Sequence, residues 1–135
     1  MAIDTAIVIY FAERNEQYIE AVRALFAAAD RGEARLVTSA ITLLEVLVVP
    51  YRAGDAALAA RYEKLLSRSR GLSLVDLGRP ILRAAAQLRA VHGVGTPDAI
   101  QLAVGLAARC GCFLTNDRRL PQLPNLPVVQ LADLV

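Results

Sequence analysis

The sequence has 135 residues, of which 56% are hydrophobic, and a formal net charge of +2. This is enough apolar material for a core, so we expect a single domain over residues 1–135. The longest apolar runs, residues 36–49 and 99–114, are interrupted by polar or charged side chains, which argues against a membrane span. The first residues lack the pattern of a signal peptide, and we therefore expect a cytoplasmic protein.

The first part of the chain predicts alternating short strands and helices. Residues 1–3 predict a very short first strand that leads into Asp4, and residues 5–13 are strongly apolar. Residues 17–29 have the apolar spacing of a helix with one buried face. A second strand is expected over residues 35–38.

The next helix is expected to begin at a cap formed by Ser39, to end near residue 52, and to contain Glu45. Leucine and valine flank Glu45 on both sides, so we expect the helix to be buried and the carboxylate to need a partner. A metal ion is one such partner. Thr42 lies about one turn earlier and is expected on the same face of the helix.

The middle of the chain continues the same alternation. Asp55 is suited to cap a helix over residues 56–69, which carries many basic side chains. A third strand is expected over residues 72–75. Asp76 follows that strand and is suited to cap a helix over residues 80–91.

The last helix is expected over residues 96–110, with Thr96 as N-cap, Pro97 at the first helical position and Gly111 as the stop signal. Asp98 then lies in the first turn, where the helix dipole stabilises a carboxylate. The remaining strands are expected over residues 112–114 and 128–131. Strands that alternate with helices predict an α/β fold with a mostly parallel sheet of four to five strands and helices on both faces.

Four acidic residues are expected at one edge of this sheet: Asp4, Glu45, Asp98 and Asp117. Ligand sites of open α/β sheets lie at the carboxyl ends of the strands. Each acid also has a plain structural role, as a helix cap, a turn residue or half of an ion pair. Together, four neighbouring carboxylates require protonation or a hard divalent cation, and their oxygen atoms suit Mg²⁺ or Mn²⁺.

Other chemistries fail on particular residues. A haloacid-dehalogenase-type phosphatase needs a second aspartate two residues after the first, where this chain has Ala6. A receiver domain needs a lysine after a late strand, and the one lysine here is Lys64. Cys110 and Cys112 cannot complete a zinc site with a single histidine in the chain, so free thiols are expected.

Several stretches that span nearly the whole chain resemble PIN-domain ribonucleases, and more narrowly the VapC-type toxins of VapBC toxin–antitoxin systems. They are DTAIVIY at residues 4–10, TSAITLLEV at 38–46, TPDAI at 96–100 and LTND at 114–117. Two features depart from the family pattern. The first strand is short, and Gln101 stands where many relatives carry histidine.

The resemblance implies a PIN-like three-layer fold and a role for each acid. By that resemblance the catalytic and metal-binding residues are Asp4, Glu45, Asp98 and Asp117, with Thr5 and Thr115 as supporting polar residues. The implied activity is endoribonuclease cleavage of RNA phosphodiester bonds with one or two Mg²⁺ or Mn²⁺ ions. The alternative is a PIN-like module that binds RNA or a protein without cutting.

The resemblance also implies partners: a VapB-type antitoxin, and as substrate a transfer RNA or a ribosomal RNA loop. A homodimer is expected because so apolar a small domain has surface that is difficult to cover. All basic residues except Lys64 are arginine, which suits phosphate contacts, although a GC-rich genome produces the same bias. The RNA-binding candidates near the acids are Arg14, Arg52, Arg118 and Arg119.

Overall fold

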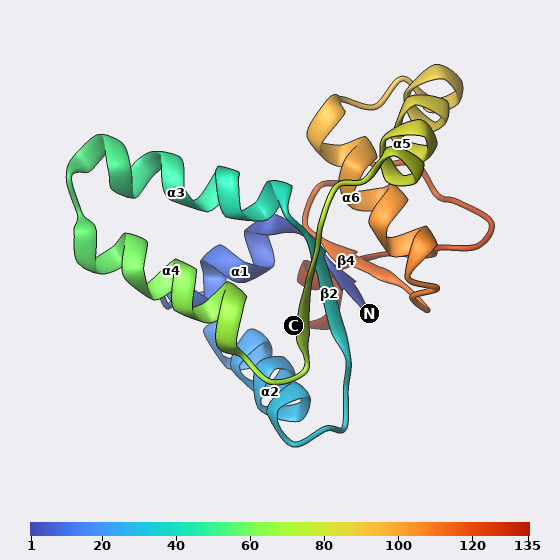
Figure 1. Ribbon diagram of the computed structural model, residues 1–135. Coiled ribbons are helices and arrows are strands. Elements are labelled where there is room, and N and C mark those ends of the chain that lie inside the picture. The colour runs from blue at the N-terminus through green and yellow to red at the C-terminus, as the bar shows by residue number, and fades with distance from the viewer.

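A computed structural model describes residues 1–135 and shows a five-stranded, entirely parallel sheet with helices on both sides (Figure 1). The strand order is β3-β2-β1-β4-β5, so β1 lies in the middle of the sheet. The strands are β1 (Ala2–Ile3), β2 (Leu36–Ser39), β3 (Leu72–Val75), β4 (Phe113–Thr115) and β5 (Val128–Gln130). The α/β class and the parallel sheet predicted from the sequence are therefore confirmed.

Six α-helices and one short 3-10 helix connect or follow the strands. They are α1 (Thr5–Ala12), α2 (Ile19–Asp30), α3 (Ile41–Ala53), α4 (Ala56–Arg68), α5 (Arg79–His92), α6 (Thr96–Ala107) and η1 (Leu131–Leu134). None of the helices is both long and apolar enough to cross a bilayer. In Figure 1, α3 and α4 form an arm on one side of the sheet, and α5 and α6 lie on the other side.

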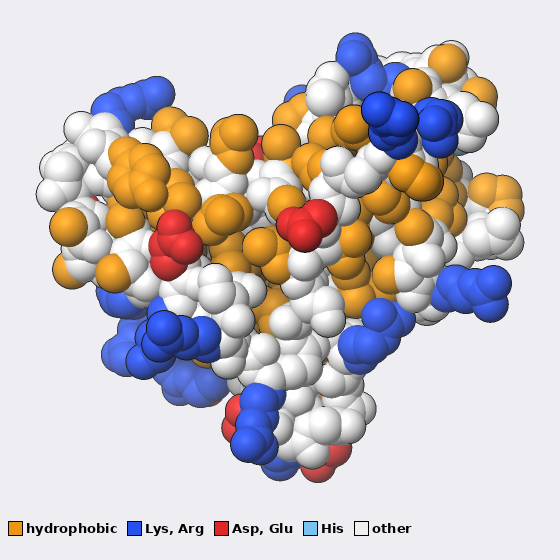
Figure 2. All heavy atoms as spheres, viewed as in Figure 1, with side chains coloured by type: hydrophobic (Ala, Val, Ile, Leu, Met, Phe, Trp, Pro, Cys, Tyr) orange, Lys and Arg blue, Asp and Glu red, His pale blue; other side chains and the backbone are white.

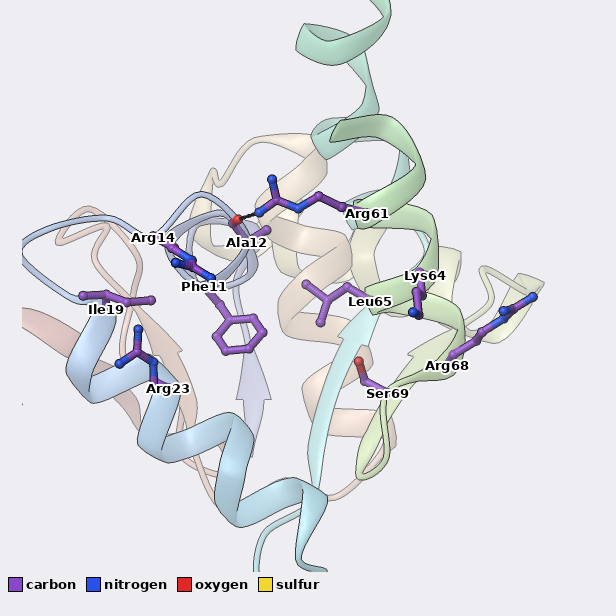
Figure 3. Close-up of a pocket in the computed structure, with 10 residues that line it drawn as sticks. All are labelled: Phe11, Ala12, Arg14, Ile19, Arg23, Arg61, Lys64, Leu65, Arg68 and Ser69. Carbon is purple, nitrogen blue, oxygen red and sulfur yellow. Dashed lines mark hydrogen bonds between the residues drawn. The ribbon is translucent and has the colours of Figure 1, made fainter. Parts of the chain in front are cut away.

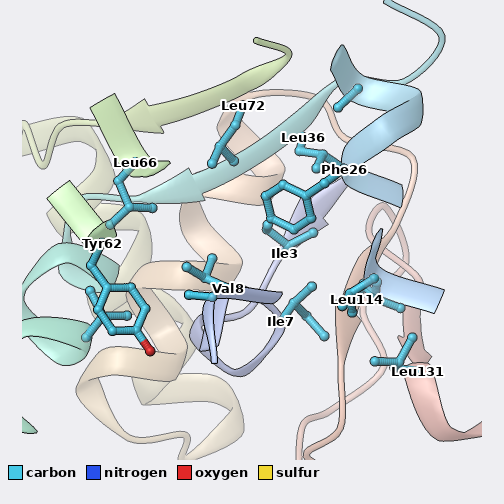
Figure 4. Packing of buried hydrophobic residues seen from close by; sticks show 14 of the residues in the cluster. Ile3, Ile7, Val8, Phe26, Leu36, Tyr62, Leu66, Leu72, Leu114 and Leu131 are labelled. Atoms are coloured by element: carbon cyan, nitrogen blue, oxygen red, sulfur yellow. The ribbon is translucent and has the colours of Figure 1, made fainter. Parts of the chain in front are cut away.

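The core has two parts because successive residues of a strand face opposite sides of the sheet. Ile3, Leu36 and Leu114 pack with helices α1 to α4 on one face, and Figure 4 shows these three side chains facing residues of the helices. Their neighbours Ala2 and Val37 pack with α5 and α6 on the other face. The result is a three-layer arrangement of helices, sheet and helices.

Two elements differ from the sequence analysis in kind. The apolar segment after Asp4 forms the helix α1, to which the sequence assigned no element; its buried residues are Thr5, Ile7, Val8 and Ala12. The last strand ends at Gln130, and Leu131 begins the helix η1 instead of closing the strand.

Several predicted helix boundaries were wrong. The N-cap of α6 is Gly95 rather than Thr96, whose hydroxyl accepts a hydrogen bond from Arg89 Nη1 at 2.9 Å. Asp76 does not cap α5, because that helix begins one residue after Gly78. A glycine suits such a position since its backbone is unrestricted.

The remaining boundary corrections concern α3 and the end of α6. Ser39 is the last residue of β2, and the N-cap of α3 is Ala40, although Ser39 Oγ accepts a hydrogen bond from Ile41 N at 3.3 Å. Helix α6 ends at Ala107, before Gly111, and Arg109 takes the left-handed conformation at φ 54°. The cap at Asp55 is confirmed, since its side chain accepts from Leu58 N.

The strand order places a topological switch point between β1 and β4. The chain moves from β1 to β2 and β3 in one direction and then crosses to β4 on the other side of β1. The backbone joins the two strands just beyond β1, where Asp4 N donates to Leu114 O at 3.0 Å. Crevices at such points are where open parallel sheets bind ligands.

Candidate active site

Asp4 lies at the switch point, directly after β1, and is the N-cap of α1. Its Oδ1 accepts a hydrogen bond from Thr5 N at 2.8 Å, and its Oδ2 accepts one from the Thr115 hydroxyl at 2.7 Å. Thr115 is the last residue of β4 and is fully buried. The side chain of Asp4 is therefore fixed from two neighbouring strands.

Glu45 approaches the same place from α3. Its Oε1 accepts a hydrogen bond from the Thr5 hydroxyl at 2.7 Å. The helix is not buried all round as the sequence suggested: Leu44 is 60% exposed, and Glu45 is half-buried. Helix α3 packs against α1, α4 and α6 and leaves its other side open, so Glu45 is partly exposed to solvent.

A buried polar network centred on Gln101 of α6 lies beneath Thr5. Gln101 Nε2 donates to Thr42 Oγ1 at 2.7 Å and to Thr5 Oγ1 at 3.1 Å. Gln101 Oε1 accepts from Ser39 N at 3.2 Å. The hydroxyls of Thr38 and Thr42 also share a hydrogen bond at 2.8 Å. Because Thr5 accepts from Gln101, its own proton is free to bind Glu45.

Asp98 and Asp117 complete the set of acids. Asp98 lies in the first turn of α6, as expected, and Asp117 follows β4 by two residues. Asp117 N donates to Thr115 Oγ1 at 3.0 Å, and the Asp117 side chain accepts from Arg119. Thr115 thus contacts two of the four acids at once.

The pKa values reflect the crowding of negative charge. Burial raises the pKa of Asp4, and the charges of Glu45 and Asp117 raise it further. Burial likewise raises the pKa of Asp98, followed by the charges of Asp4 and Asp117. The pKa of Asp117 is lowered, chiefly by its hydrogen bond from Arg119. These mutual effects link all four acids into one electrostatic group.

This group offers only carboxylate oxygen atoms, the ligands that hard cations such as Mg²⁺ and Mn²⁺ prefer. As the side chains lie, no three of the acids surround a single point at coordination distance. Glu45 is turned toward Thr5, and Asp117 toward Arg119. The donor chemistry therefore fits a divalent cation, and coordination by three of these acids would require one or more of their side chains to rotate.

The four arginines expected near the acids have different positions. Arg119 is the one arginine that makes an ion pair with one of the four acids, with Arg119 Nη2 at 2.9 Å from Asp117 Oδ2. Arg118 instead pairs with Asp133 at 2.7 Å. Arg14 follows the far end of α1, and Arg52 lies seven residues beyond Glu45 in α3, about 10 Å along the helix axis.

Arg14 belongs to a separate, positively charged groove between α1, α2 and α4 (Figure 3). Its apolar floor includes Phe11, Ile19 and Leu65. Figure 3 shows Arg61, Lys64 and Arg68 along the α4 side and Arg23 on the α2 side. No acidic residue lines this groove. From the sequence, the helix over residues 56–69, now α4, was expected to carry basic side chains. The sequence did not indicate that an apolar groove lies beside them.

The sequence analysis also missed most of the Gln101 network. A single glutamine within the apolar run of residues 99–106 was the available signal, because a buried amide must find partners. The free thiols were predicted: Cys110 is buried and Cys112 half-buried, without a disulfide.

We expect Asp4→Asn to raise the stability of the protein in the absence of divalent cations. Asparagine keeps the Oδ1 acceptor for Thr5 N, and its amide can donate to the Thr115 oxygen in place of the bond that Oδ2 accepted. It also removes the charge whose burial and repulsion raise the pKa of Asp4 above 3.8. A raised pKa means that the native protein loses stability from this group as the pH rises through it. The gain in melting temperature should therefore be largest at neutral pH and shrink as the pH falls toward 4.

Asp55→Asn is the matched control, because Asp55 is also an N-cap but is exposed. Thermal melts of both variants in EDTA at pH 4 and pH 7.5 make the comparison. An Asp4→Asn protein that is no more stable than the wild type at pH 7.5 would contradict the crowding of charge at this site.

Solved structures with the same fold cover almost the whole chain. The toxin–antitoxin complex from Klebsiella pneumoniae has a TM-score of 0.73 at 22% identity, with 96% of each chain covered. VapBC2 from Rickettsia felis, bound to a DNA fragment from its promoter, has a TM-score of 0.72 at 17% identity, with 96% of each chain covered. VapC20 from Mycobacterium tuberculosis, a toxin that cleaves the sarcin–ricin loop, has a TM-score of 0.67 at 15% identity over 83% of this chain and 85% of that one.

The sequence itself gives a narrower result. No curated protein matches it. The family model of the PIN domain, in contrast, matches residues 1–126, which include the strands β1 to β4 and all four acids. The chain therefore belongs to the PIN-domain family.

Proposed function

We propose that this protein is a divalent-metal-dependent endoribonuclease and the toxin of a VapBC-type toxin–antitoxin pair. The observation that carries the proposal is the group of four acids, Asp4, Glu45, Asp98 and Asp117, around the switch point of the sheet. The PIN-domain family and the likeness in fold to VapBC complexes support it.

The four carboxylates would hold one or two Mg²⁺ or Mn²⁺ ions, which supply an activated water and neutralise charge on the phosphate. The chain's own hydroxyls orient the ligands: Thr115 donates to Asp4, and Thr5 donates to Glu45. Such outer partners fix ligand geometry in metal sites. No side-chain nucleophile is required, and His92 is exposed at the end of α5, outside the acidic group.

The substrate we propose is single-stranded RNA or an exposed loop of a transfer or ribosomal RNA. A flexible strand can adopt the geometry that in-line attack by water needs, whereas a duplex resists this change. Cations near the acids, of which Arg119 is the nearest, would offset the repulsion between the site and the phosphates.

The test is a cleavage assay on a single-stranded RNA and a hairpin RNA with Mn²⁺, with Mg²⁺ and with EDTA. We expect internal cleavage with either metal and none in EDTA. RNA binding without cleavage, under conditions in which the protein binds Mn²⁺, would favour the non-cutting PIN-like module.

We propose the groove of Figure 3 as the docking surface for a segment of the antitoxin. An apolar floor with a rim of five cationic side chains and no acidic one suits an amphipathic segment that carries both apolar and acidic residues. RNA backbone matches the charge but leaves Phe11, Ile19 and Leu65 without apolar partners. We therefore assign the groove to the protein partner.

A charge reversal on α4 tests this assignment. We expect Lys64→Glu with Arg68→Glu to weaken binding of the cognate antitoxin roughly tenfold or more, because both cations line the groove. Arg79→Glu with Arg83→Glu is the control, since these exposed cations have the same spacing on α5. Equal antitoxin affinity of the two double variants, measured by calorimetry, would exclude the groove as the docking surface.

We further propose a homodimer. Leu44, Val48 and Tyr51 form an exposed apolar stripe along α3, at 60%, 39% and 65% exposure. Figure 2, viewed as in Figure 1, shows apolar side chains over the arm of α3 and α4 and over the side of α5 and α6, with a notch between these two parts. We expect light scattering to give about twice the 14.5 kDa mass of the chain. A monomer at high micromolar concentration would contradict a dimer.

A further inference from the structure

Asp117 and Arg119 form a fork that engages both oxygens of one proposed metal ligand. Arg119 Nε donates to Asp117 Oδ1 at 3.0 Å, and Arg119 Nη2 donates to Oδ2 at 2.9 Å. The backbone N of Arg119 also donates to Oδ1 at 2.9 Å. Among the four acids, Asp117 alone is bound by a cationic group of the chain.

This contact competes with a metal ion in two ways. A divalent cation would need the same carboxylate oxygens, and the guanidinium charge beside them repels it. The other ligands differ, because Thr115 and Thr5 are neutral donors that leave further lone pairs of Asp4 and Glu45 free.

The main chain of Asp117 is anchored independently of Arg119. Its N–H donates to Thr115 Oγ1 at 3.0 Å, and its carbonyl oxygen accepts from Gln130 Nε2 at 3.2 Å. The Arg119 side chain is 88% exposed, and its guanidinium has no other partner. Exposed ion pairs are weak, so the carboxylate can turn inward without moving the backbone.

We propose that Arg119 is a positioning residue, which holds the Asp117 carboxylate in a metal-free orientation and releases it when a divalent cation binds. This inference rests on the proposed metal-dependent function. Without metal, Arg119 binds Asp117 of its own chain. After the metal has bound, Arg119 is free to contact other anions.

Calorimetric titration with Mn²⁺ tests the exchange. We expect Arg119→Ala to bind Mn²⁺ roughly twofold to fivefold more tightly than the wild type, the range that loss of an exposed ion pair allows. Arg119→Lys keeps the charge but not the fork, so its affinity should lie between the two. Weaker binding by Arg119→Ala would mean that Arg119 orients Asp117 toward the metal, and it would overturn the proposal.

The chain offers two matched controls. Arg31 makes the same two-bond fork to Glu33, two residues away, at 3.0 and 2.9 Å on the surface. Arg118 precedes Arg119 but pairs with Asp133. Arg31→Ala and Arg118→Ala should leave the Mn²⁺ affinity unchanged. A gain in Arg118→Ala equal to that in Arg119→Ala would assign the effect to net charge and overturn the specific role.

A second readout follows Arg119 itself in the wild-type protein. We expect the Arg119 Nε–H resonance in NMR spectra to shift when Mg²⁺ is added, while the Arg31 resonance stays in place. An Arg119 resonance that does not move at saturating Mg²⁺ would overturn the proposed release of Asp117 by Arg119 but not the proposed metal binding. A wild-type protein that binds no divalent cation would instead refute the proposed function, so the two failures are distinguishable.

Discussion

Replacing Gln101 with leucine is expected to lower the free energy of unfolding by about 3 kcal/mol. Gln101 is 2% exposed and joins Thr5, Thr42 and Ser39 through hydrogen bonds. Leucine fills a similar volume but removes the Gln101 acceptor of the buried Ser39 N–H. It also removes the amide donor to the Thr5 and Thr42 hydroxyls, which keep their hydrogen bonds to each other, to Glu45 and to Thr38. Buried donors without partners are among the most costly defects in a core.

Urea denaturation measures this loss, and Gln87→Leu is the matched control. Gln87 lies on α5 and is exposed, so its replacement should change the free energy of unfolding by less than about 0.5 kcal/mol. If Gln101→Leu unfolds at the same urea concentration as the control, the network does not stabilise the fold in the manner described.

Asp98→Asn is expected to reduce metal-dependent RNA cleavage by at least about 100-fold. Loss of a residue that merely supports a ligand already costs roughly 10- to 100-fold, and Asp98 is proposed as a ligand itself. Its position in the first turn of α6 makes the substitution compatible with folding, because asparagine has nearly the same shape. The assay compares initial rates at saturating Mn²⁺.

Asp76→Asn provides the control for that comparison, since Asp76 is an exposed acid outside the group of four. Circular dichroism establishes that both variants fold. Cleavage by Asp98→Asn within about threefold of the control would remove Asp98 from the site, a margin well below the 10-fold effect of an outer-shell residue.

The strands and the acids were accessible from the sequence because both rely on local signals. Short apolar runs followed by Asp4 or by Thr115, Asn116 and Asp117 predict strands with acidic and polar side chains at or beyond their carboxyl ends. Alternation of strands and helices then predicts a parallel sheet. The position of Asp98 in the first turn of α6 followed from Pro97, which is favourable at a helix start.

The errors have physical causes that the sequence does not record. Residues 5–12 are apolar on nearly every side, so no periodic pattern identified the helix α1. Glu45 was expected inside a buried helix, but the arm of α3 and α4 is packed on one side and open on the other. Arg118 and Arg119 are identical and adjacent, yet they pair with Asp133 and Asp117 because consecutive side chains point in different directions.

Calorimetric titration of the wild-type protein, Asp4→Asn and Asp98→Asn with Mn²⁺ tests most directly whether the acids form one metal site. We predict saturable binding by the wild type, with a melting temperature that rises with Mn²⁺ concentration because the ion binds the native state. Either substitution should weaken binding at least about tenfold, since each removes a charged ligand. A wild-type protein whose melting temperature is unchanged in saturating Mn²⁺, or two variants that bind as tightly as the wild type, would contradict a shared metal site.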